Sequence, residues 1–225
     1  AKPRVMLGCT MQFFPSVDHA VLMTILAKKI TCQPTLDLCH TILASGDKIL
    51  ADEYDIAFFE GDDLLATQRP RGLPIGNLTS QFWANVYMNE LDQFVKRELK
   101  CKTYLRYVDD FLLFSDSKKT LWEWKTAMRE KLNTLRLTMH EASSTVYPTK
   151  NGIPFLGFNL FATHRRLKNR NARAFEHRYR AMQVAFANGE ITLEQISQRV
   201  QGWVAHAQHA ASACAAVRNQ CVRMV

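Results

Sequence analysis

The sequence lacks the features of a membrane-spanning or disulfide-stapled protein. No apolar run approaches the roughly 20 residues that a transmembrane helix needs, and no signal peptide is visible. None of the six cysteines forms a CxxC pair, and a chain of 225 residues can bury a core without disulfide staples. These absences predict no membrane association and a reducing, cytoplasmic setting.

Positive charge is in excess, with 29 Lys and Arg against 21 Asp and Glu and a formal net charge of +8. Hydrophobic residues make up 47% of the chain, which favours a folded domain with a sizeable core over disorder. A positive excess favours polyanionic partners such as nucleic acid, although many basic proteins bind none. Composition alone therefore leaves nucleic-acid binding open.

Hydrophobic spacing predicts strands and helices mixed along the first 160 or so residues, which indicates an α+β body. A buried strand is expected over residues 4–9. A helix capped by Asp18 follows it, and a second helix fits residues 35–44. Residues 47–77 are rich in Gly and Pro, and a long irregular segment of this kind is usually functional or flexible.

Two longer helices follow. The first covers residues 78–99, with Thr79 or Ser80 as its cap, and its expected inner face consists of Phe82, Val86, Met88, Leu91 and Val95. The second ends near Leu135, with Asp116 or Ser117 as its cap, and has apolar residues at helical spacing: Leu121, Trp124, Met128 and Leu132.

The C-terminal part is expected to contain short strands and then basic helices. The strands fit residues 137–139, 145–147 and 153–158, and the turn dipeptide Asn151-Gly152 precedes the last of them. A basic run at residues 164–173 leads into a helix, and the capping box of Thr192 and Gln195 predicts one more.

An acidic hairpin tip is the strongest chemical signal. Asp109 and Asp110 stand between two apolar segments, residues 103–108 and 111–114, which read as two paired strands. Adjacent carboxylates repel each other, and a hard divalent cation such as Mg²⁺ would relieve the repulsion. Two such ions can clamp a phosphoryl transfer. An exposed acidic turn without a metal is the alternative that these residues leave open.

Five segments, in order and spacing, resemble the motifs of reverse transcriptases. They are residues 12–19 (QFFPSVDH), 71–81 (RGLPIGNLTSQ), 107–114 (YVDDFLLF), 152–158 (GIPFLGF) and 202–206 (GWVAH). The match spans nearly the whole chain. The version of the second motif, with Ile75 and Gln81, resembles that of diversity-generating retroelements and related bacterial enzymes. In that family the change is associated with relaxed fidelity, although it could be a lineage variant only.

The resemblance implies a reverse-transcriptase palm, an antiparallel sheet with packed helices, over residues 1–164. A partial helical thumb would occupy residues 165–225. Fingers are largely absent, so we expect a fragment or a trimmed product. The implied activity is RNA-directed DNA synthesis: two-metal nucleotidyl transfer from dNTPs onto a DNA primer along an RNA template, with Mg²⁺ or Mn²⁺. An accessory protein is left open.

The resemblance also implies roles for individual residues. Asp109, Asp110 and the backbone of Thr10 would bind metal. The substrate-binding positions would be Phe14, Ile75, Gly76, Gln81, Leu156 and Gly157. Phe14 would act as a steric gate against a ribose 2′-hydroxyl, with a core aromatic beside Phe13 as the alternative. Ile75, Gly76 and Gln81 would line the template and nucleotide surface, and Leu156 and Gly157 would support the primer.

Two departures from the family pattern predict a severely weakened enzyme. Cys9 stands where the family has a third metal-binding aspartate, and a thiol suits softer metals than Mg²⁺. Ser143 stands where the family has a lysine that protonates the leaving group. A remnant that binds RNA or DNA without catalysis is therefore the second hypothesis.

A zinc module near the C-terminal end is a third and weaker hypothesis. His and Cys are zinc ligands, and four of them lie close together in the sequence: His206, His209, Cys214 and Cys221. Their spacings match no zinc-finger pattern.

Overall fold

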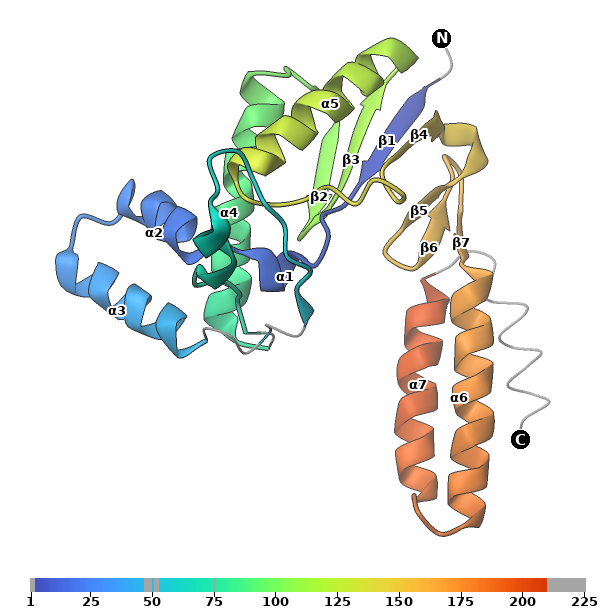
Figure 1. Cartoon of the computed structure of the whole chain (residues 1–225). Coiled ribbons are helices and arrows are strands. Elements are labelled where there is room, and N and C mark those ends of the chain that lie inside the picture. Colours follow the sequence, from blue (N-terminus) through green and yellow to red (C-terminus); the bar gives the residue numbers. More distant parts are fainter. Residues whose placement is uncertain (1–2, 47–49, 51–52, 75, 210–225) are drawn as a thin grey trace. The chain divides into compact units, whose positions relative to one another are not determined.

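The computed structural model describes residues 3–46, 50, 53–74 and 76–209, and the chain divides into two compact units, Ala1–Pro148 and Thr149–Val225. Each unit combines antiparallel strands with helices, which confirms the α+β class (Figure 1). The predicted boundary between palm and thumb, at residues 164 and 165, is a functional division and differs from the boundary between the two compact units. It stays a prediction.

The first unit is built on a four-stranded antiparallel sheet with the order β2-β3-β1-β4. The strands are β1 (Arg4–Gly8), β2 (Tyr104–Tyr107), β3 (Asp110–Ser115) and β4 (Thr145–Pro148). The two central strands, β1 and β3, carry the most deeply buried side chains of the sheet, among them Val5, Met6, Phe111 and Leu113. Their position inside the sheet explains why both read as continuous apolar runs rather than alternating ones.

The first unit also contains helices, one of which packs directly on the sheet. They are α1 (Phe13–Ser16), α2 (His19–Ala27), α3 (Gln33–Ser45), α4 (Leu78–Arg97) and α5 (Lys118–Thr134). Helix α5 contacts β1, β3 and β4, and α4 contacts both α5 and α2 (Figure 1). A short 3-10 helix, η2 (Leu64–Gln68), lies in the long loop before α4.

Two of the three helix caps predicted for the first unit are confirmed. Asp18 accepts a hydrogen bond from the third residue of α2, and Ser117 does the same for α5. The prediction for α4 was wrong, because Asn77 is its cap and accepts from the Thr79 amide at 3.2 Å. Thr79 and Ser80 instead belong to the first turn of the helix.

The predicted inner face of α4 was partly wrong. Phe82 is 63% exposed, whereas the fully buried positions follow the spacing Trp83, Tyr87, Leu91 and Val95. Helix α4 packs against both α2 and α5. On its buried face, Tyr87 Oη donates to the Leu135 carbonyl at 2.6 Å. Burial raises the pKa of Tyr87 because the phenolate form would be desolvated.

The predicted strand over residues 137–139 is also absent. This segment meets β1's continuation through a single bridge between Thr10 and Met139 and one backbone bond, from the Met11 amide to the Thr138 carbonyl at 2.8 Å. The pairing is too short to extend the sheet.

The second unit holds a three-stranded antiparallel sheet and a helix pair. Its elements are η3 (Thr149–Asn151), β5 (Ile153–Phe155), β6 (Phe158–Leu160), β7 (Arg165–Leu167), α6 (Asn169–Ala187) and α7 (Leu193–Gln208). The predicted single strand over 153–158 is a hairpin instead, because Leu156 (φ 46°) and Gly157 (φ 85°) reverse the chain. The capping box at Thr192 and Gln195 is confirmed.

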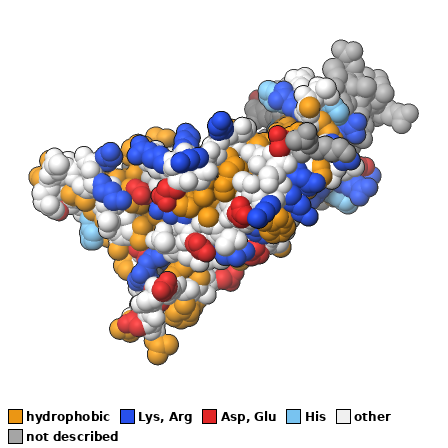
Figure 2. Space-filling model, turned by 90° about the horizontal axis from the view of Figure 1, so that it is seen from above, with side chains coloured by type: hydrophobic (Ala, Val, Ile, Leu, Met, Phe, Trp, Pro, Cys, Tyr) orange, Lys and Arg blue, Asp and Glu red, His pale blue; other side chains and the backbone are white. Residues whose placement is uncertain are grey.

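The surface is mixed rather than uniformly basic. On the face in Figure 2, Lys and Arg side chains lie in several groups, with acidic and hydrophobic side chains between them. Within the described ranges, no helix is long and apolar enough to cross a membrane.

Candidate active site

The acidic tip lies on a hairpin that the sheet holds firmly. Strands β2 and β3 pair antiparallel with Tyr107 opposite Asp110, so Val108 and Asp109 form the connection. Beyond the tip, β3 is anchored by Phe111, which is fully buried. Val108 adopts the left-handed region with φ 54°, which for a β-branched residue costs about 1–3 kcal/mol. Such strain persists only where the surroundings enforce it.

Cys9 lies beside this tip, as the sequence predicted. Gly8 of β1 pairs with Phe111 of β3, and Cys9 and Asp110 are the next residues beyond that pair. A Cβ on Gly8 would stand 2.2 Å from the Phe111 ring, so only glycine allows this close approach of the two strands. Burial, followed by the charges of Asp110 and Asp109, raises the pKa of the Cys9 thiol. Three predicted positions thus converge, and the thiol among them is protonated at neutral pH.

The two carboxylates fit a hard divalent cation, whereas the thiol does not. Burial raises the pKa of Asp109, and the charge of Asp110 adds to the effect. A divalent cation offsets both costs, and carboxylate oxygens are the ligands that Mg²⁺ prefers. Across the described part of the chain, no group of three or more His, Cys, Asp or Glu side chains could hold a metal ion. The site offers two carboxylates and, at the position of the family's third aspartate, the thiol of Cys9.

The second departure from the family pattern lies next to the first. The Ser143 side chain lies beside the Cys9 thiol and lowers its pKa, against the larger effect of burial. The backbone of the same turn is fixed to β1's end, because the His140 amide donates to the Cys9 carbonyl at 2.9 Å. The Ser143 amide in turn donates to His140 Nδ1 at 3.2 Å. The altered positions 9 and 143 therefore form one local cluster.

A buried lysine supports this turn, and the sequence analysis missed it. Lys125 is 6% exposed, and its Nζ donates to the Ser144 carbonyl at 2.7 Å and pairs with Glu141 at 2.9 Å. The signal was present in the sequence, because Lys125 lies four residues after Leu121 and three before Met128, on the apolar face of α5. A charged residue on that face indicates a buried partner.

Phe14 lies beside the segment that leads to Gly76. Phe13 is buried at 4% exposure, while Phe14 is only partly buried and meets Phe13 edge-on with ring centroids 5.4 Å apart. The Phe14 carbonyl accepts from the Leu73 amide at 2.9 Å, and the Val17 carbonyl accepts from the Gly72 amide at 2.9 Å. The segment that leads to Gly76 thus lies along the segment that carries Phe14.

The remaining substrate positions of this unit lie at the start of α4. Gly76 has φ 94° and directly precedes the cap residue Asn77. Gln81 is exposed in the first turns of the helix. Ile75 lies outside the described residues. Thr10 follows Cys9 and faces Met139 in the isolated bridge.

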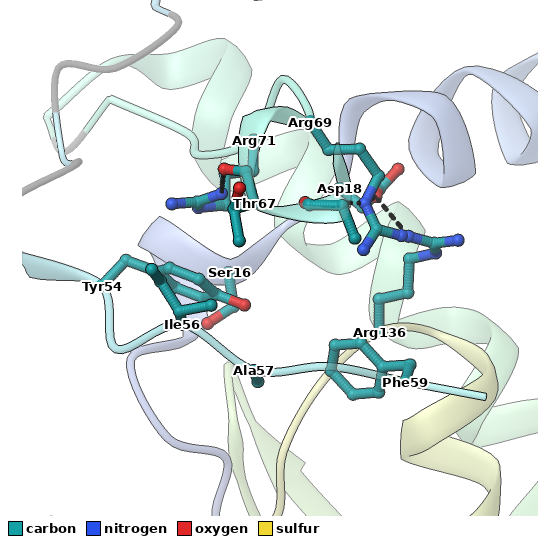
Figure 3. A pocket seen from close by; sticks show the side chains of 11 residues that line it. Ser16, Asp18, Tyr54, Ile56, Ala57, Phe59, Thr67, Arg69, Arg71 and Arg136 are labelled. Atoms are coloured by element: carbon teal, nitrogen blue, oxygen red, sulfur yellow. Dashed lines mark hydrogen bonds and ion pairs between the residues drawn. The ribbon is translucent and has the colours of Figure 1, made fainter. Parts of the chain in front are cut away.

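An ion cluster that the sequence did not reveal fixes the long loop, and Figure 3 shows three of its side chains, those of Asp18, Arg69 and Arg136. Arg69 forms two hydrogen bonds with Asp62, one of them from Nη1 at 2.9 Å, and its Nε lies 4.0 Å from Asp18. Arg136 Nη1 lies 3.5 Å from Asp18 and 3.4 Å from Asp62. Arg71 packs over the Tyr54 ring at 3.9 Å. The cluster connects the loop to the start of α2 and the chain after α5.

Leu156 and Gly157 occupy the β5–β6 turn of the second unit. Leu156 is 44% exposed, and the Gly157 carbonyl accepts from the Lys168 amide at 3.2 Å and from Asn171 Nδ2 at 3.3 Å. The exposed arginines of this unit include Arg165, Arg166, Arg170 and Arg173. The His206 ring packs against Phe158 at 4.9 Å. Cys214 and Cys221 of the zinc hypothesis lie outside the described residues.

Comparison with known proteins identifies the family. The sequence profile described as reverse transcriptase (RNA-dependent DNA polymerase) matches residues 10–160, well over half of the chain, and begins one residue after Cys9. No curated protein matches the chain as a relative.

Solved structures of telomerase are similar to this chain at low identity. Apo telomerase from Candida tropicalis, truncated from its C-terminal domain, has a TM-score of 0.48 at 13% identity and covers 73% of this chain. Telomerase from Candida tropicalis and from Candida albicans, each with the TWJ fragment of telomeric RNA, gives TM-scores of 0.49 and 0.46 at 12% and 16% identity, covering 71% and 75% of this chain. This chain spans 34%, 29% and 31% of those three proteins, respectively. The profile match carries the assignment: the chain belongs to the reverse transcriptase family.

Proposed function

We propose that this chain is the palm of an RNA-directed DNA polymerase, a nucleotidyltransferase that adds dNTPs to a DNA primer along an RNA template. The observation that carries the proposal is the convergence of Cys9, Asp109 and Asp110 where β1 meets the β2–β3 hairpin. Membership of the family supplies the activity class. RNA template, primer and dNTPs are the partners that follow from it.

In this proposal Asp109 and Asp110 would hold Mg²⁺ or Mn²⁺. When bound, such cations supply activation of the primer hydroxyl and neutralise charge on the leaving pyrophosphate. Phe14 would exclude a ribose 2′-hydroxyl, and Gly76 and Gln81 would contact template and nucleotide. In the second unit, Leu156 and Gly157 would support the primer, and the exposed arginines would hold phosphates in a salt-dependent way.

Catalysis should be weak in the chain as it stands. A protonated thiol at Cys9 adds no negative charge to the metal site, and Ser143 cannot donate a proton as a cationic acid does. The contact between these two positions favours the second candidate function, a protein that binds RNA or DNA without extending it. Both candidates share the same fold and the same exposed arginines of the second unit.

Primer extension on an RNA template with Mg²⁺ or Mn²⁺ separates them. We expect Cys9→Asp to raise incorporation at least about a hundredfold, the typical effect of restoring one charge-stabilising group in an active site. Cys9→Ser, which restores no carboxylate, is the matched control and should stay at the level of the parent. Full activity without the reversion contradicts the weakening. Salt-dependent template binding with no incorporation in either chain supports the binding remnant.

Similarity to the retroelement type of bacterial enzyme is a finer proposal that rests on Ile75 and Gln81. A glutamine side chain at position 75 could hydrogen-bond near the nascent base pair, and Ile75 removes that amide. In the Cys9→Asp background, Ile75→Gln should lower misincorporation, measured by sequencing the cDNA. Equal error rates would show that Ile75 is a lineage variant only. The cytoplasmic setting stays a prediction of this proposal.

A further inference from the structure

A largely buried arginine of β2 connects the active-site hairpin to α4. Arg106 Nε and Nη2 donate to the two carboxylate oxygens of Asp92 at 2.8 and 2.7 Å. Its Nη1 donates to the backbone carbonyl of Val108 at 2.8 Å and to Asn85 Oδ1 at 3.3 Å. The Arg106 side chain is only 11% exposed and that of Asp92 20%. One guanidinium therefore spans from a helix to the turn that carries Asp109.

The turn needs such a restraint, because Val108 adopts a conformation that its side chain opposes. The left-handed region is common for glycine and tolerated by asparagine, but it is rare for β-branched residues. The carbonyl that Arg106 holds belongs to the peptide between Val108 and Asp109. Fixing that oxygen fixes the peptide plane from which the Asp109 side chain projects.

The carboxylate that holds Arg106 is itself held in place. Asp92 Oδ1 also accepts from Tyr104 Oη at 2.8 Å, and Tyr104 lies two residues before Arg106 on the same strand. A bidentate pair between a guanidinium and a carboxylate has a fixed geometry. The arrangement thus transmits the position of α4, through Asp92 and Arg106, to the tip of the hairpin.

We infer that Arg106 is a positioning residue that holds the Val108 carbonyl and thereby orients the Asp109 carboxylate toward a bound divalent cation. The catalytic consequence rests on the proposed function, whereas the ordering of the hairpin does not. An ion pair that only stabilises the sheet would leave the tip conformation independent of the bond to Val108.

Arg106→Lys in the Cys9→Asp chain tests the inference. Lysine keeps a positive charge beside Asp92, but one ammonium cannot span both the carboxylate and the Val108 carbonyl. We expect faster amide hydrogen exchange at residues 109–111 and about a tenfold rise in the Mn²⁺ concentration for half-maximal incorporation, as loss of one charge-assisted hydrogen bond implies. Arg97→Lys, an exposed arginine on α4, controls for loss of a guanidinium.

A second substitution distinguishes positioning from general stability. Asparagine adopts the left-handed region at lower cost than valine. Val108→Asn added to Arg106→Lys should therefore restore slow exchange and bring the Mn²⁺ concentration for half-maximal incorporation most of the way back to that of the parent. Unchanged exchange in Arg106→Lys overturns the inference, as does faster exchange that Val108→Asn fails to restore. If exchange responds as expected but the Mn²⁺ requirement does not move, the catalytic role is overturned. If the Cys9→Asp parent incorporates no nucleotide, the proposed function fails, and the exchange data still decide whether Arg106 orders the tip.

Discussion

Two parts of the first unit lie at or beside the predicted site, and different forces hold them in place. The β2–β3 hairpin is anchored by buried residues of β3: Phe111, Leu112 and Leu113 are at most 2% exposed. The loop over residues 53–71, by contrast, contains no fully buried residue. Its anchors are charges and polar side chains: the ion cluster around Asp62, and two hydrogen bonds between Gln12 and Asp55 at 3.1 and 2.9 Å.

Because of this difference, we expect the order of the loop, unlike that of the hairpin, to depend on salt and pH. Apolar burial depends little on salt or pH, whereas ion pairs are screened by salt and are lost when their carboxylates are protonated. The acidic tip should therefore keep its geometry under conditions that release the loop. Phe14 and Gly76, which lie near the loop and have proposed roles in nucleotide and template binding, should be the first to lose order.

The largest effect is expected from the apolar anchor of the hairpin. Phe111→Ala removes a fully buried ring above Gly8 and should cost about 3–5 kcal/mol in the free energy of unfolding. Urea denaturation followed by circular dichroism measures it. Leu64→Ala in the loop, at an 85% exposed position, is the matched control and should change stability by less than about 0.5 kcal/mol. Equal losses of stability at the two positions would contradict the claim that apolar burial anchors the hairpin and not the loop.

A smaller and local effect is expected from the ion cluster. Arg69→Met removes the partner of Asp62 and leaves two buried carboxylates near one remaining cation, Arg136. Chymotrypsin should then cut the loop several-fold faster, while the global unfolding midpoint changes little. High salt should produce part of the same change in the parent chain. Arg97→Met is the control, and an unchanged cleavage rate in Arg69→Met would mean that other contacts hold the loop.

The smallest effect is a shift in the titration of one carboxyl. Hydrogen bonds from Arg69 and from the Phe59 amide lower the pKa of Asp62. Such a group stabilises the fold above its unfolded pKa of about 3.9, and the contribution disappears as the pH falls through the lower, folded value. We expect NMR titration to place Asp62 below about 3.9, and Arg69→Met to raise the midpoint. A midpoint above that value in the parent chain would contradict the contact.

The same contrast explains what the sequence could predict. The acidic hairpin, the Asp18 cap and the Thr192 capping box depend on residues within a few positions of each other, and all three are confirmed. The ion cluster joins Asp18, Asp62 and Arg136, which lie far apart in the chain, so no local pattern reveals it. Cys9 was placed correctly beside the aspartates only because a family pattern supplied the long-range pairing.

The errors have local physical causes as well. The segment 153–158 contains no polar turn residue, so the sequence indicated a single strand. In the structure Gly157 belongs to the turn between β5 and β6. Phe82 was assigned to the inner face of α4 because it is apolar, yet the helix is rotated by packing against two neighbours at once. The roles of Gly76, Gln81, Leu156 and Gly157 in substrate binding stay predictions.

The contact between the Cys9 and Ser143 side chains makes the order of substitutions matter for any change toward the family pattern at these two positions. If aspartate replaces Cys9 first, the Ser143 hydroxyl can still donate to the new carboxylate, and a metal gains a ligand at once. If lysine replaces Ser143 first, its ammonium becomes an internal counter-ion for Asp109 and Asp110 and competes with the cation. Mn²⁺ binding by the two single variants measures this difference. We expect Cys9→Asp to bind Mn²⁺ more tightly than Ser143→Lys.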